Sequence, residues 1–279
     1  MAQNNPLQQY FRQPAIYIRL PSNGNFYPDG ALDMPPNGEI PVFPMTAIDE
    51  ISYRTPDALF NGAATVDVIR SCVPNIRDPW AMPAMDLDTV LVSIRIATYG
   101  HSMDIDTRCP ACKEESATGV DLRILLEMIR TPDYQTPIRY RDLEIYFKPM
   151  NYKLLDENNK KQFEEQRILQ SLNDPDQSEE VKIESLNRAL KQITQITIEA
   201  LSHSIAVIKT PSAMVTESGF IIDFLKNCDR DLFTSIRDQI VKQKSTAEIQ
   251  PIKLKCRSCS HEYEQGITLN MPNFFAPAS

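Results

Sequence analysis

Glycine is scarce in this chain, which has 8 glycines and 21 prolines among 279 residues. Proline stiffens loops, and the few glycines do not form the spaced clusters of a phosphate-binding loop or a dinucleotide fingerprint. Histidine is also rare, and His101, His203 and His261 lie in no catalytic motif. A nucleophile elbow is missing as well. The sequence therefore predicts that the protein is not an enzyme and takes no small-molecule substrate.

Long hydrophobic runs and a strong bias to basic charge are missing too. The most apolar window, residues 87–97, is too short to span a bilayer. The net charge is −8 with both signs mixed, so no basic stripe is available to neutralise phosphates. No signal peptide opens the sequence, which favours a reducing compartment. We expect no membrane span and no nucleic-acid partner.

Four of the six cysteines form two identical brackets, Cys109-Pro-Ala-Cys112 and Cys256-Arg-Ser-Cys259. Two residues between the thiols allow a tight turn that directs both sulfurs to one point. Two such turns complete a tetrahedral shell of four thiolates around one zinc ion. Such a shell has no open position for water or substrate, so the predicted zinc is structural and not catalytic.

The segments around the brackets alternate in polarity as strands do. Met103 and Ile105 precede the first bracket, Ile252 and Leu254 precede the second, and residues 262–269 follow it. This arrangement is typical of a zinc ribbon, in which two hairpin tips face one ion. Residues 113–255 then form an insertion that the ribbon closes, which is tolerable because loop-closure entropy grows slowly with length.

Other uses of these cysteines stay open at this point. They could form two disulfides, or serve as redox pairs, although redox pairs normally follow a strand and open a helix. His261 could replace one thiolate. Cys72 and Cys228 stand alone and are interpreted as small buried hydrophobic residues without a role.

The first hundred residues divide into an arm, an extended segment and a helical block. Residues 1–13 are polar and are expected to form a flexible arm. A strand is predicted over 15–20, and the proline-rich stretch 21–44 is expected to run extended across its own surface or a partner's. Helices are predicted over 47–54, 55–62, 64–73 and 87–97, with Thr46 capping the first and Asp86 capping the last.

The rest of the chain adds a short helix over 122–128, a hairpin over 138–147, long polar helices over 152–171 and 179–208, and short helices over 220–226 and 230–242. The two long helices either protrude and dock on another subunit or pack against the rest of their own chain. Phe274 and Phe275 either fold back or enter a neighbour. The predicted fold is α+β, a helical body with a zinc ribbon formed by two distant CxxC hairpins. The predicted domains are the arm 1–13, the segment 14–100 and the ribbon with its insertions, 101–279, the last two readable as one continuous domain.

Several sequence motifs resemble one known family. With the cysteine brackets, the runs over 40–46, 55–62, 71–76 and 94–100 resemble the baseplate protein family of T-even-type contractile-tail bacteriophages, and the resemblance covers most of residues 16–270. It implies a non-enzymatic structural protein of the myovirus virion, in the inner baseplate or hub of the tail. Such a protein is assembled in the host cytoplasm and works through contacts with other baseplate and hub proteins.

Two other functions remain open. The family also includes assembly factors, so the chain could be a transient chaperone of the baseplate hub that the mature virion lacks. A zinc-ribbon adaptor for nucleic acid or a polymerase is the alternative of another class, although acidic residues surround both predicted tips, at 113–115 and 261–264. We expect partner contacts on residues 14–45 and around Trp80. Copy number, symmetry, the particular neighbours and the host are not predictable from the sequence.

Overall fold

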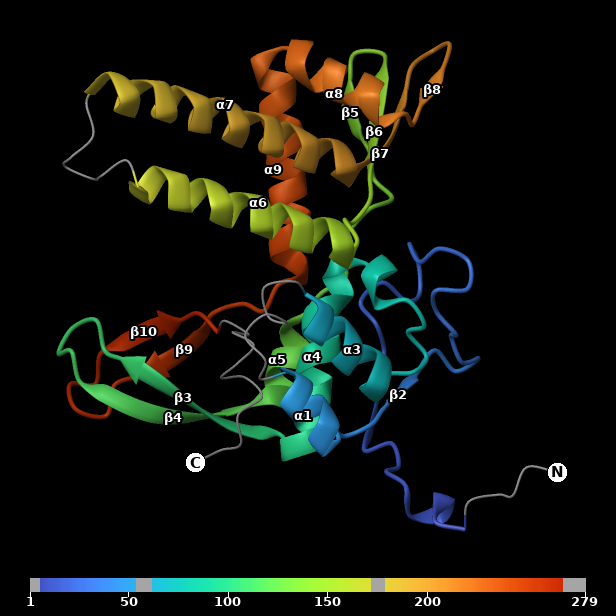
Figure 1. The fold of residues 1–279 in the computed structure, drawn as a ribbon, viewed down its shortest axis with the longest axis vertical. Coiled ribbons are helices and arrows are strands. Elements are labelled where there is room, and N and C mark those ends of the chain that lie inside the picture. The colour runs from blue at the N-terminus through green and yellow to red at the C-terminus, as the bar shows by residue number, and fades with distance from the viewer. Residues whose placement is uncertain (1–5, 54–61, 172–178, 268–279) are drawn as a thin grey trace. The chain divides into compact units, whose positions relative to one another are not determined.

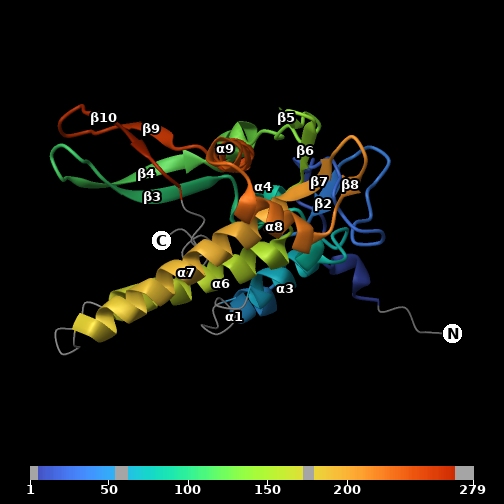
Figure 2. The ribbon, with the colours of Figure 1, turned by 90° about the horizontal axis from the view of Figure 1, so that it is seen from above.

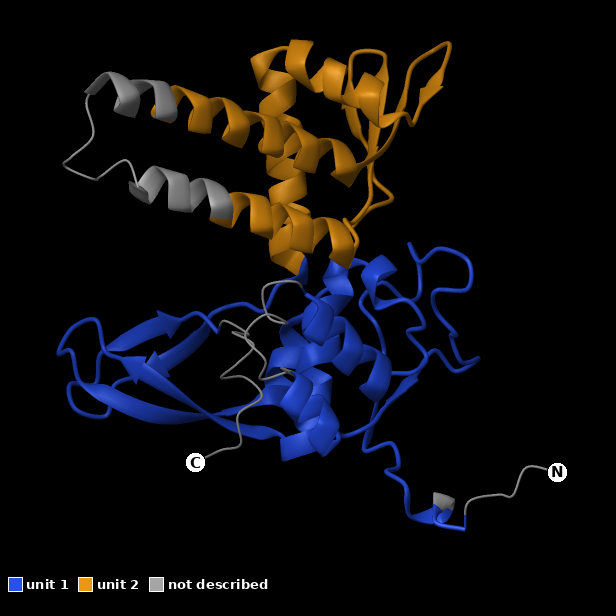
Figure 3. Cartoon of the chain, in the orientation of Figure 1, with its two compact units in different colours: residues 1–131, 247–279 blue, residues 132–246 orange. Residues whose placement is uncertain are grey.

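The structure is a computed structural model that describes residues 6–53, 62–171 and 179–267 (Figure 1). The chain divides into two compact units, shown in Figure 3: unit 1 comprises residues 1–131 and 247–279, and unit 2 comprises residues 132–246. The predicted helix over 55–62 and the two phenylalanines Phe274 and Phe275 lie outside the described residues. The domain boundaries at 13/14 and 100/101 stay predictions.

Unit 1 is built around one helix, α4 (Ala84–Tyr99), whose middle is buried on every side. The antiparallel pair β1 (Ile16–Ile18) and β2 (Ile40–Val42) packs against it, with Ile16 opposite Val42. The other elements of this body are η1 (Gln8–Tyr10), α1 (Ala47–Tyr53), α3 (Ala63–Cys72), η2 (Pro79–Ala81) and α5 (Leu122–Met128). The predicted helices over 47–54, 64–73 and 122–128 are confirmed within one residue at each end. Thr46 caps α1 as expected, because its hydroxyl accepts the Asp49 N–H at 3.2 Å.

The predicted capping role of Asp86 is wrong. Helix α4 begins at Ala84, before Asp86, so Asp86 lies in the first turn and is fully buried. Its carboxylate accepts hydrogen bonds from the N–H and hydroxyl of Ser22, at 2.8 and 2.6 Å, and from the Tyr27 hydroxyl at 3.0 Å. Asp86 therefore anchors the loop that follows β1. A capping aspartate accepts hydrogen bonds from the backbone N–H groups of its own helix, whereas Asp86 accepts them from this loop.

A buried arginine, Arg95, lies on the same helix with 1% of its surface exposed. Its guanidinium stacks over the Tyr99 ring at 4.5 Å, but Nε and Nη1 have no hydrogen-bond partner in the described structure. Burial lowers the pKa of Arg95, since the charged form loses its hydration.

We expect Arg95→Met to raise the free energy of unfolding by about 1–3 kcal/mol, because an apolar side chain of similar length removes an uncompensated buried charge. Urea unfolding measures the change. Arg77→Met is the control, because Arg77 forms an exposed ion pair with Asp33 and its loss is expected to matter little. A less stable Arg95→Met protein would contradict this view of the core.

Two hairpins extend from the body of unit 1, and Figure 2 shows them side by side, as does Figure 1. The first pairs β3 (Ser102–Arg108) with β4 (Glu115–Asp121), and the second pairs β9 (Ile252–Lys255) with β10 (Glu262–Gln265). Each cysteine bracket lies at the tip of one hairpin. We call them the cysteine hairpins.

Unit 2 combines a sheet with helices. The four strands β5 (Ile138–Tyr140), β6 (Leu143–Phe147), β7 (Ile205–Lys209) and β8 (Met214–Val215) pair antiparallel in chain order. Their register aligns one aliphatic residue from each strand in a row, namely Ile138, Ile145, Ile208 and Val215. This row packs in a core with apolar residues of α7 (Glu179–Ser204), α8 (Ser218–Asn227) and α9 (Arg230–Ala247).

The predicted end of the second long helix is wrong. Helix α7 ends at Ser204, and Ile205–Lys209 forms strand β7 instead of continuing the helix to 208. Three of these five residues are β-branched and pair with β6, so burial in the sheet outweighs helical continuation. Helix α6 (Tyr152–Ser171) lies beside α7, and Lys161 pairs with Glu199 at 3.3 Å. Docking of this pair on another subunit stays a prediction.

The architecture confirms the α+β class, since the described helices combine with several small sheets whose strands pair antiparallel. None of the helices in the described parts of the chain combines the length and the hydrophobicity that a bilayer crossing requires.

Candidate metal centre

The tip of the first cysteine hairpin is a tight turn closed by backbone hydrogen bonds. The Cys109 N–H donates to the Glu114 carbonyl at 2.9 Å, and the Lys113 N–H donates to the Cys109 carbonyl at 3.0 Å. Lys113 takes a left-handed conformation, with φ of 63°. This turn brings the chain back on itself after Cys112 and allows β4 to pair with β3.

The tip of the second hairpin repeats this geometry. The Cys256 N–H donates to the His261 carbonyl at 2.9 Å, and the Ser260 N–H donates to the Cys256 carbonyl at 3.0 Å. Ser260 is left-handed as well, with φ of 59°. The two brackets therefore build the same local structure, each directing two sulfurs to one side of its turn.

The four sulfurs of the two tips form one cluster, in which all of them lie within 4.8 Å of one another. The Sγ atoms of Cys109 and Cys259 are 3.7 Å apart, and those of Cys112 and Cys256 are 3.6 Å apart. Four thiolates at the usual zinc–sulfur distance of about 2.3 Å would lie about 3.8 Å from one another on a tetrahedron. The donor set and its spacing fit a zinc ion with four sulfur ligands. All six cysteines of the chain are free thiols in the structure.

The thiols of the cluster differ in acidity, and the backbone explains part of the difference. The N–H groups of Cys112 and Ala111 lower the pKa of Cys109, and those of Cys259 and Ser258 lower the pKa of Cys256 to about 7. The first cysteine of each tip therefore favours the thiolate.

The second cysteine of the first tip behaves in the opposite way. The Glu114 N–H lowers the pKa of Cys112, but the neighbouring Cys259, Cys256 and Cys109 thiols, together with burial, raise it to about 12. Four thiolates side by side repel one another, so full deprotonation of the cluster needs a cation.

The two hairpins also contact each other away from the sulfurs. The Tyr263 hydroxyl donates to the Thr107 hydroxyl at 3.1 Å, and Thr107 is 4% exposed. Ile105 and Leu254 pack at the edge of the unit 1 core. The shared interior is small, so few apolar contacts hold the tips together.

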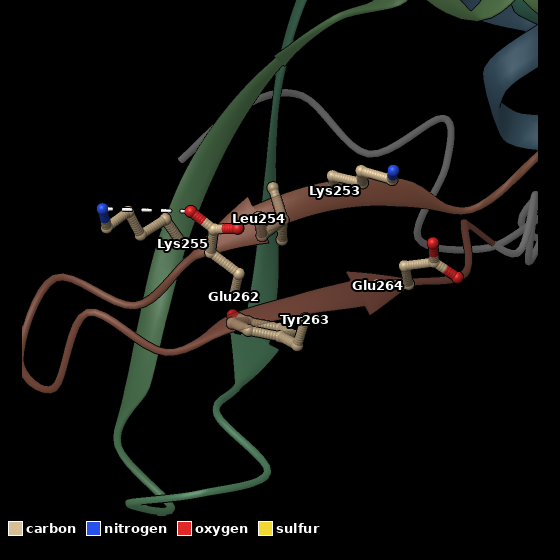
Figure 4. A pocket seen from close by; sticks show the side chains of 6 residues that line it. All are labelled: Lys253, Leu254, Lys255, Glu262, Tyr263 and Glu264. Atoms are coloured by element: carbon tan, nitrogen blue, oxygen red, sulfur yellow. Dashed lines mark ion pairs between the residues drawn. The ribbon is translucent and has the colours of Figure 1, made fainter.

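The opposite face of the second hairpin carries lysines on β9 and glutamates on β10. Lys255 is opposite Glu262 with an ion pair at 3.9 Å, and Lys253 is opposite Glu264 (Figure 4). Cross-strand pairs of opposite charge favour this register over its neighbours. An open hollow of about 400 Å³ lies here, lined by Lys253, Leu254, Lys255, Glu262, Tyr263 and Glu264.

His261 does not belong to the sulfur cluster. Its carbonyl closes the second tip, and its ring stacks on Tyr263 with 6.5 Å between ring centroids. Among the described residues, the four cysteines alone form a group that could hold a metal ion. Of the two remaining cysteines, Cys72 is buried as expected, whereas Cys228 is partly exposed.

The left-handed residues of the tips lead to a stability prediction. We expect Lys113→Gly and Ser260→Gly each to raise the free energy of unfolding by about 0.5–1 kcal/mol, because glycine takes positive φ without steric cost. Thermal unfolding of the metal-loaded protein measures the change. Lys253→Gly is the control, since this lysine lies within a strand, where glycine is expected to destabilise. A loss of stability at both tips would contradict the turn geometry.

Comparison with known proteins connects this structure with a family. A family profile described as "T4 bacteriophage base plate protein" matches residues 45–276. Because the match covers most of the chain, the protein belongs to this family of bacteriophage baseplate proteins, which confirms the resemblance noted in the sequence. No curated protein and no solved structure matches the chain.

Sequence reasoning missed two polar clusters that organise unit 1. One joins Asp86 to Ser22 and Tyr27, and the other joins Arg12 to Asp49 and Ser71. An aspartate beside the apolar stripe of α4 was the available signal for the first. Nothing in the sequence around Arg12 indicates that it would be anchored.

Proposed function

We propose that this protein is a zinc-stabilised structural component of the contractile phage tail, in the inner baseplate or hub, and that it works through protein–protein contacts. Membership in the baseplate family supports the place of action. The observation that carries the zinc assignment is the cluster of four sulfurs at tetrahedral spacing.

In this proposal the zinc ion makes the cysteine hairpins into a zinc ribbon. Cys109, Cys112, Cys256 and Cys259 hold the ion and complete its coordination shell. Two-stranded hairpins are marginal in water, and the interior that these two share is small. Metal binding therefore supplies folding free energy that apolar burial does not provide here.

The protein is proposed to have no catalytic activity. A zinc ion with four protein ligands has no open position for a substrate or an activated water. The hollow beside β9 and β10 is lined by lysines that lie opposite glutamates. Such cross-strand pairs of opposite charge stabilise the pairing of the two strands and do not indicate a catalytic site. The unit 1 surfaces are proposed to bind other baseplate proteins instead.

Elemental analysis tests the metal directly. Protein purified without chelators is expected to contain one zinc per chain, and a protein lacking Cys112 and Cys259 is expected to contain none. Absence of zinc from the parent protein, or equal zinc in both proteins, would contradict the proposal.

The alternative within the family is a transient assembly factor. Mass spectrometry of intact purified tails distinguishes the two roles, because a subunit is present at a fixed copy number whereas an assembly factor is absent. We expect the subunit result, since a metal-closed fold suits a part that persists in the particle. Tails without this protein would favour the assembly factor.

An alternative function of a different class is that of an adaptor for nucleic acid or for a polymerase. On the outer face of β9 and β10 each lysine lies opposite a glutamate, and Asp104 and Asp106 are exposed on β3. Such surfaces repel phosphates as much as they attract them. A DNA-binding assay at two salt concentrations is expected to show no specific binding at either, and a steep salt dependence would support the adaptor.

A further inference from the structure

A short series of hydrogen bonds joins the two cysteine hairpins below their tips. The Tyr263 hydroxyl of β10, labelled in Figure 4, donates to the Thr107 hydroxyl of β3 at 3.1 Å. The Thr107 hydroxyl in turn donates to the Ser116 carbonyl of β4 at 3.1 Å. The series therefore crosses from the second hairpin to both strands of the first. We call the contact between the two side chains the Thr107–Tyr263 bridge.

The bridge lies at the same level of both hairpins. Thr107 belongs to the second residue pair from the turn of the first hairpin, where it is opposite Ser116. Tyr263 belongs to the second pair from the turn of the second hairpin, where it is opposite Leu254. Thr107 and Leu254 each precede the first cysteine of their tip by two residues, which is about 7 Å of strand. A contact at this level controls how far apart the two tips stand.

The hydrogen bonds of the bridge allow one of its groups to be removed cleanly. Thr107 is buried, and its hydroxyl keeps the Ser116 carbonyl as acceptor when the Tyr263 hydroxyl is absent. Loss of the tyrosine oxygen therefore leaves no buried donor without a partner. A change of Tyr263 to phenylalanine removes the bond between the hairpins and keeps the ring.

We propose that Thr107 and Tyr263 are positioning residues for the metal centre, which raise its zinc affinity by bringing the two tips together before the ion binds. This proposal rests on the zinc site proposed above. The four ligands come from two separate hairpins, so a metal-free chain binds zinc only in the fraction of molecules whose tips are close. The apparent dissociation constant is the intrinsic constant divided by that fraction. A contact that favours close tips without touching the ion therefore tightens zinc binding.

The bridge biases the tips and does not replace the ion. One hydrogen bond between neutral groups changes the fraction of molecules with close tips about two- to tenfold. A structural zinc ion supplies far more folding free energy than one such bond. The metal-free hairpins thus stay apart in most molecules, and loss of the bridge passes in full into the zinc affinity.

Competition with a coloured chelator measures the zinc affinity of the full-length protein. Tyr263→Phe is expected to weaken zinc binding about two- to tenfold. Thr107→Val is expected to weaken it as well, whereas Thr107→Ser keeps the hydroxyl and is expected to bind nearly as tightly as the parent. The double variant Tyr263→Phe, Thr107→Val is expected to bind no more weakly than Thr107→Val alone, because both changes remove the same bond. Equal zinc affinity in Tyr263→Phe and the parent would overturn the proposal.

Tyr140→Phe is the matched control. It removes a hydroxyl that donates to Asp229 at 2.6 Å, within unit 2 and outside the cysteine hairpins. This variant is expected to keep the zinc affinity of the parent. An equal loss of affinity in Tyr140→Phe and Tyr263→Phe would overturn the proposal, because affinity would then follow the general stability of the chain. Circular dichroism confirms that each variant is folded.

Cobalt in place of zinc separates positioning from ligation. The absorption spectra of the cobalt-loaded parent and Tyr263→Phe are expected to be the same, because the bridge changes the fraction of close tips and not the four sulfur ligands. Different spectra would overturn the positioning role, since Tyr263 would then act on the coordination shell itself. A parent protein that binds no zinc would defeat the zinc assignment together with the bridge. Equal, tight binding by the parent and Tyr263→Phe would defeat the bridge alone.

Discussion

Replacing Cys256 by serine is expected to release the metal and destabilise unit 1 by at least about 3 kcal/mol, since structural zinc sites supply folding free energy. For a chain of this size, such a loss lowers the melting temperature by roughly 6–12 °C. Because the second tip then no longer holds the first, β3–β4 and β9–β10 are expected to separate. Differential scanning calorimetry together with zinc analysis measures both effects.

The matched control for this change is Cys228→Ser. It makes the same substitution in unit 2, at a thiol that is partly exposed and lies outside the cluster. We expect the control to keep its zinc and nearly its full stability, and addition of a strong chelator to the parent protein to reproduce the loss seen in Cys256→Ser. Equal melting temperatures and normal tail yield for Cys256→Ser and the parent would contradict a structural zinc.

Asp86→Ala is expected to cost about 3 kcal/mol of stability, since it leaves several buried donors without an acceptor. The Ser22 N–H, the Ser22 hydroxyl and the Tyr27 hydroxyl all donate to this carboxylate. Urea unfolding measures the change. Asp67→Ala, on an exposed part of α3, is the control and is expected to change stability little. An Asp86→Ala protein as stable as the control would show that the loop after β1 does not need this anchor.

Asp86→Asn separates the hydrogen bonds from the charge. Burial raises the pKa of Asp86 from 3.8 to about 6, and the hydrogen bonds from Ser22 and Tyr27 reduce that rise. The folded state thus binds the proton more tightly than the unfolded state, so this group's contribution to stability falls as the pH rises from about 4 to about 6. The parent protein is therefore expected to gain stability relative to the Asp86→Asn variant as the pH is lowered from about 7 to about 5. A difference that does not change with pH would contradict the buried ionised carboxylate.

The elements that sequence reasoning located are those that local chemistry determines. Thr46 caps α1 as expected and Asp121 caps α5, because a capping side chain needs only the backbone two or three residues away. The cysteine brackets are equally local, since two intervening residues suffice to build each tip. The two identical brackets also predicted that the tips would meet, and the four sulfurs do lie together. The path of residues 113–255 that brings the tips together depends on distant contacts and was not predictable in the same way.

The errors arose where distant parts of the chain compete with local preference. Asp86 stands at a plausible cap position, but Ser22 and Tyr27, more than fifty residues earlier, supply its donors. Ile205 and Ile208 continue a helical pattern, but their partners in β6 turn them into a strand. The anchoring of Arg12 was also unpredictable, because its partners Ser71 and Asp49 lie on two different helices, α3 and α1, far along the chain.

The positions of the two cysteine tips along the chain have a consequence for biosynthesis. At a translation rate of roughly 5–20 residues per second, Cys256 is synthesised roughly 7–29 s after Cys112. During this interval Cys109 and Cys112 can supply only two of the four zinc ligands, while all of unit 2 is synthesised. Unit 2 can therefore fold before the metal closes the chain, and unit 1 reaches its final form only after the second pair of thiols has been made.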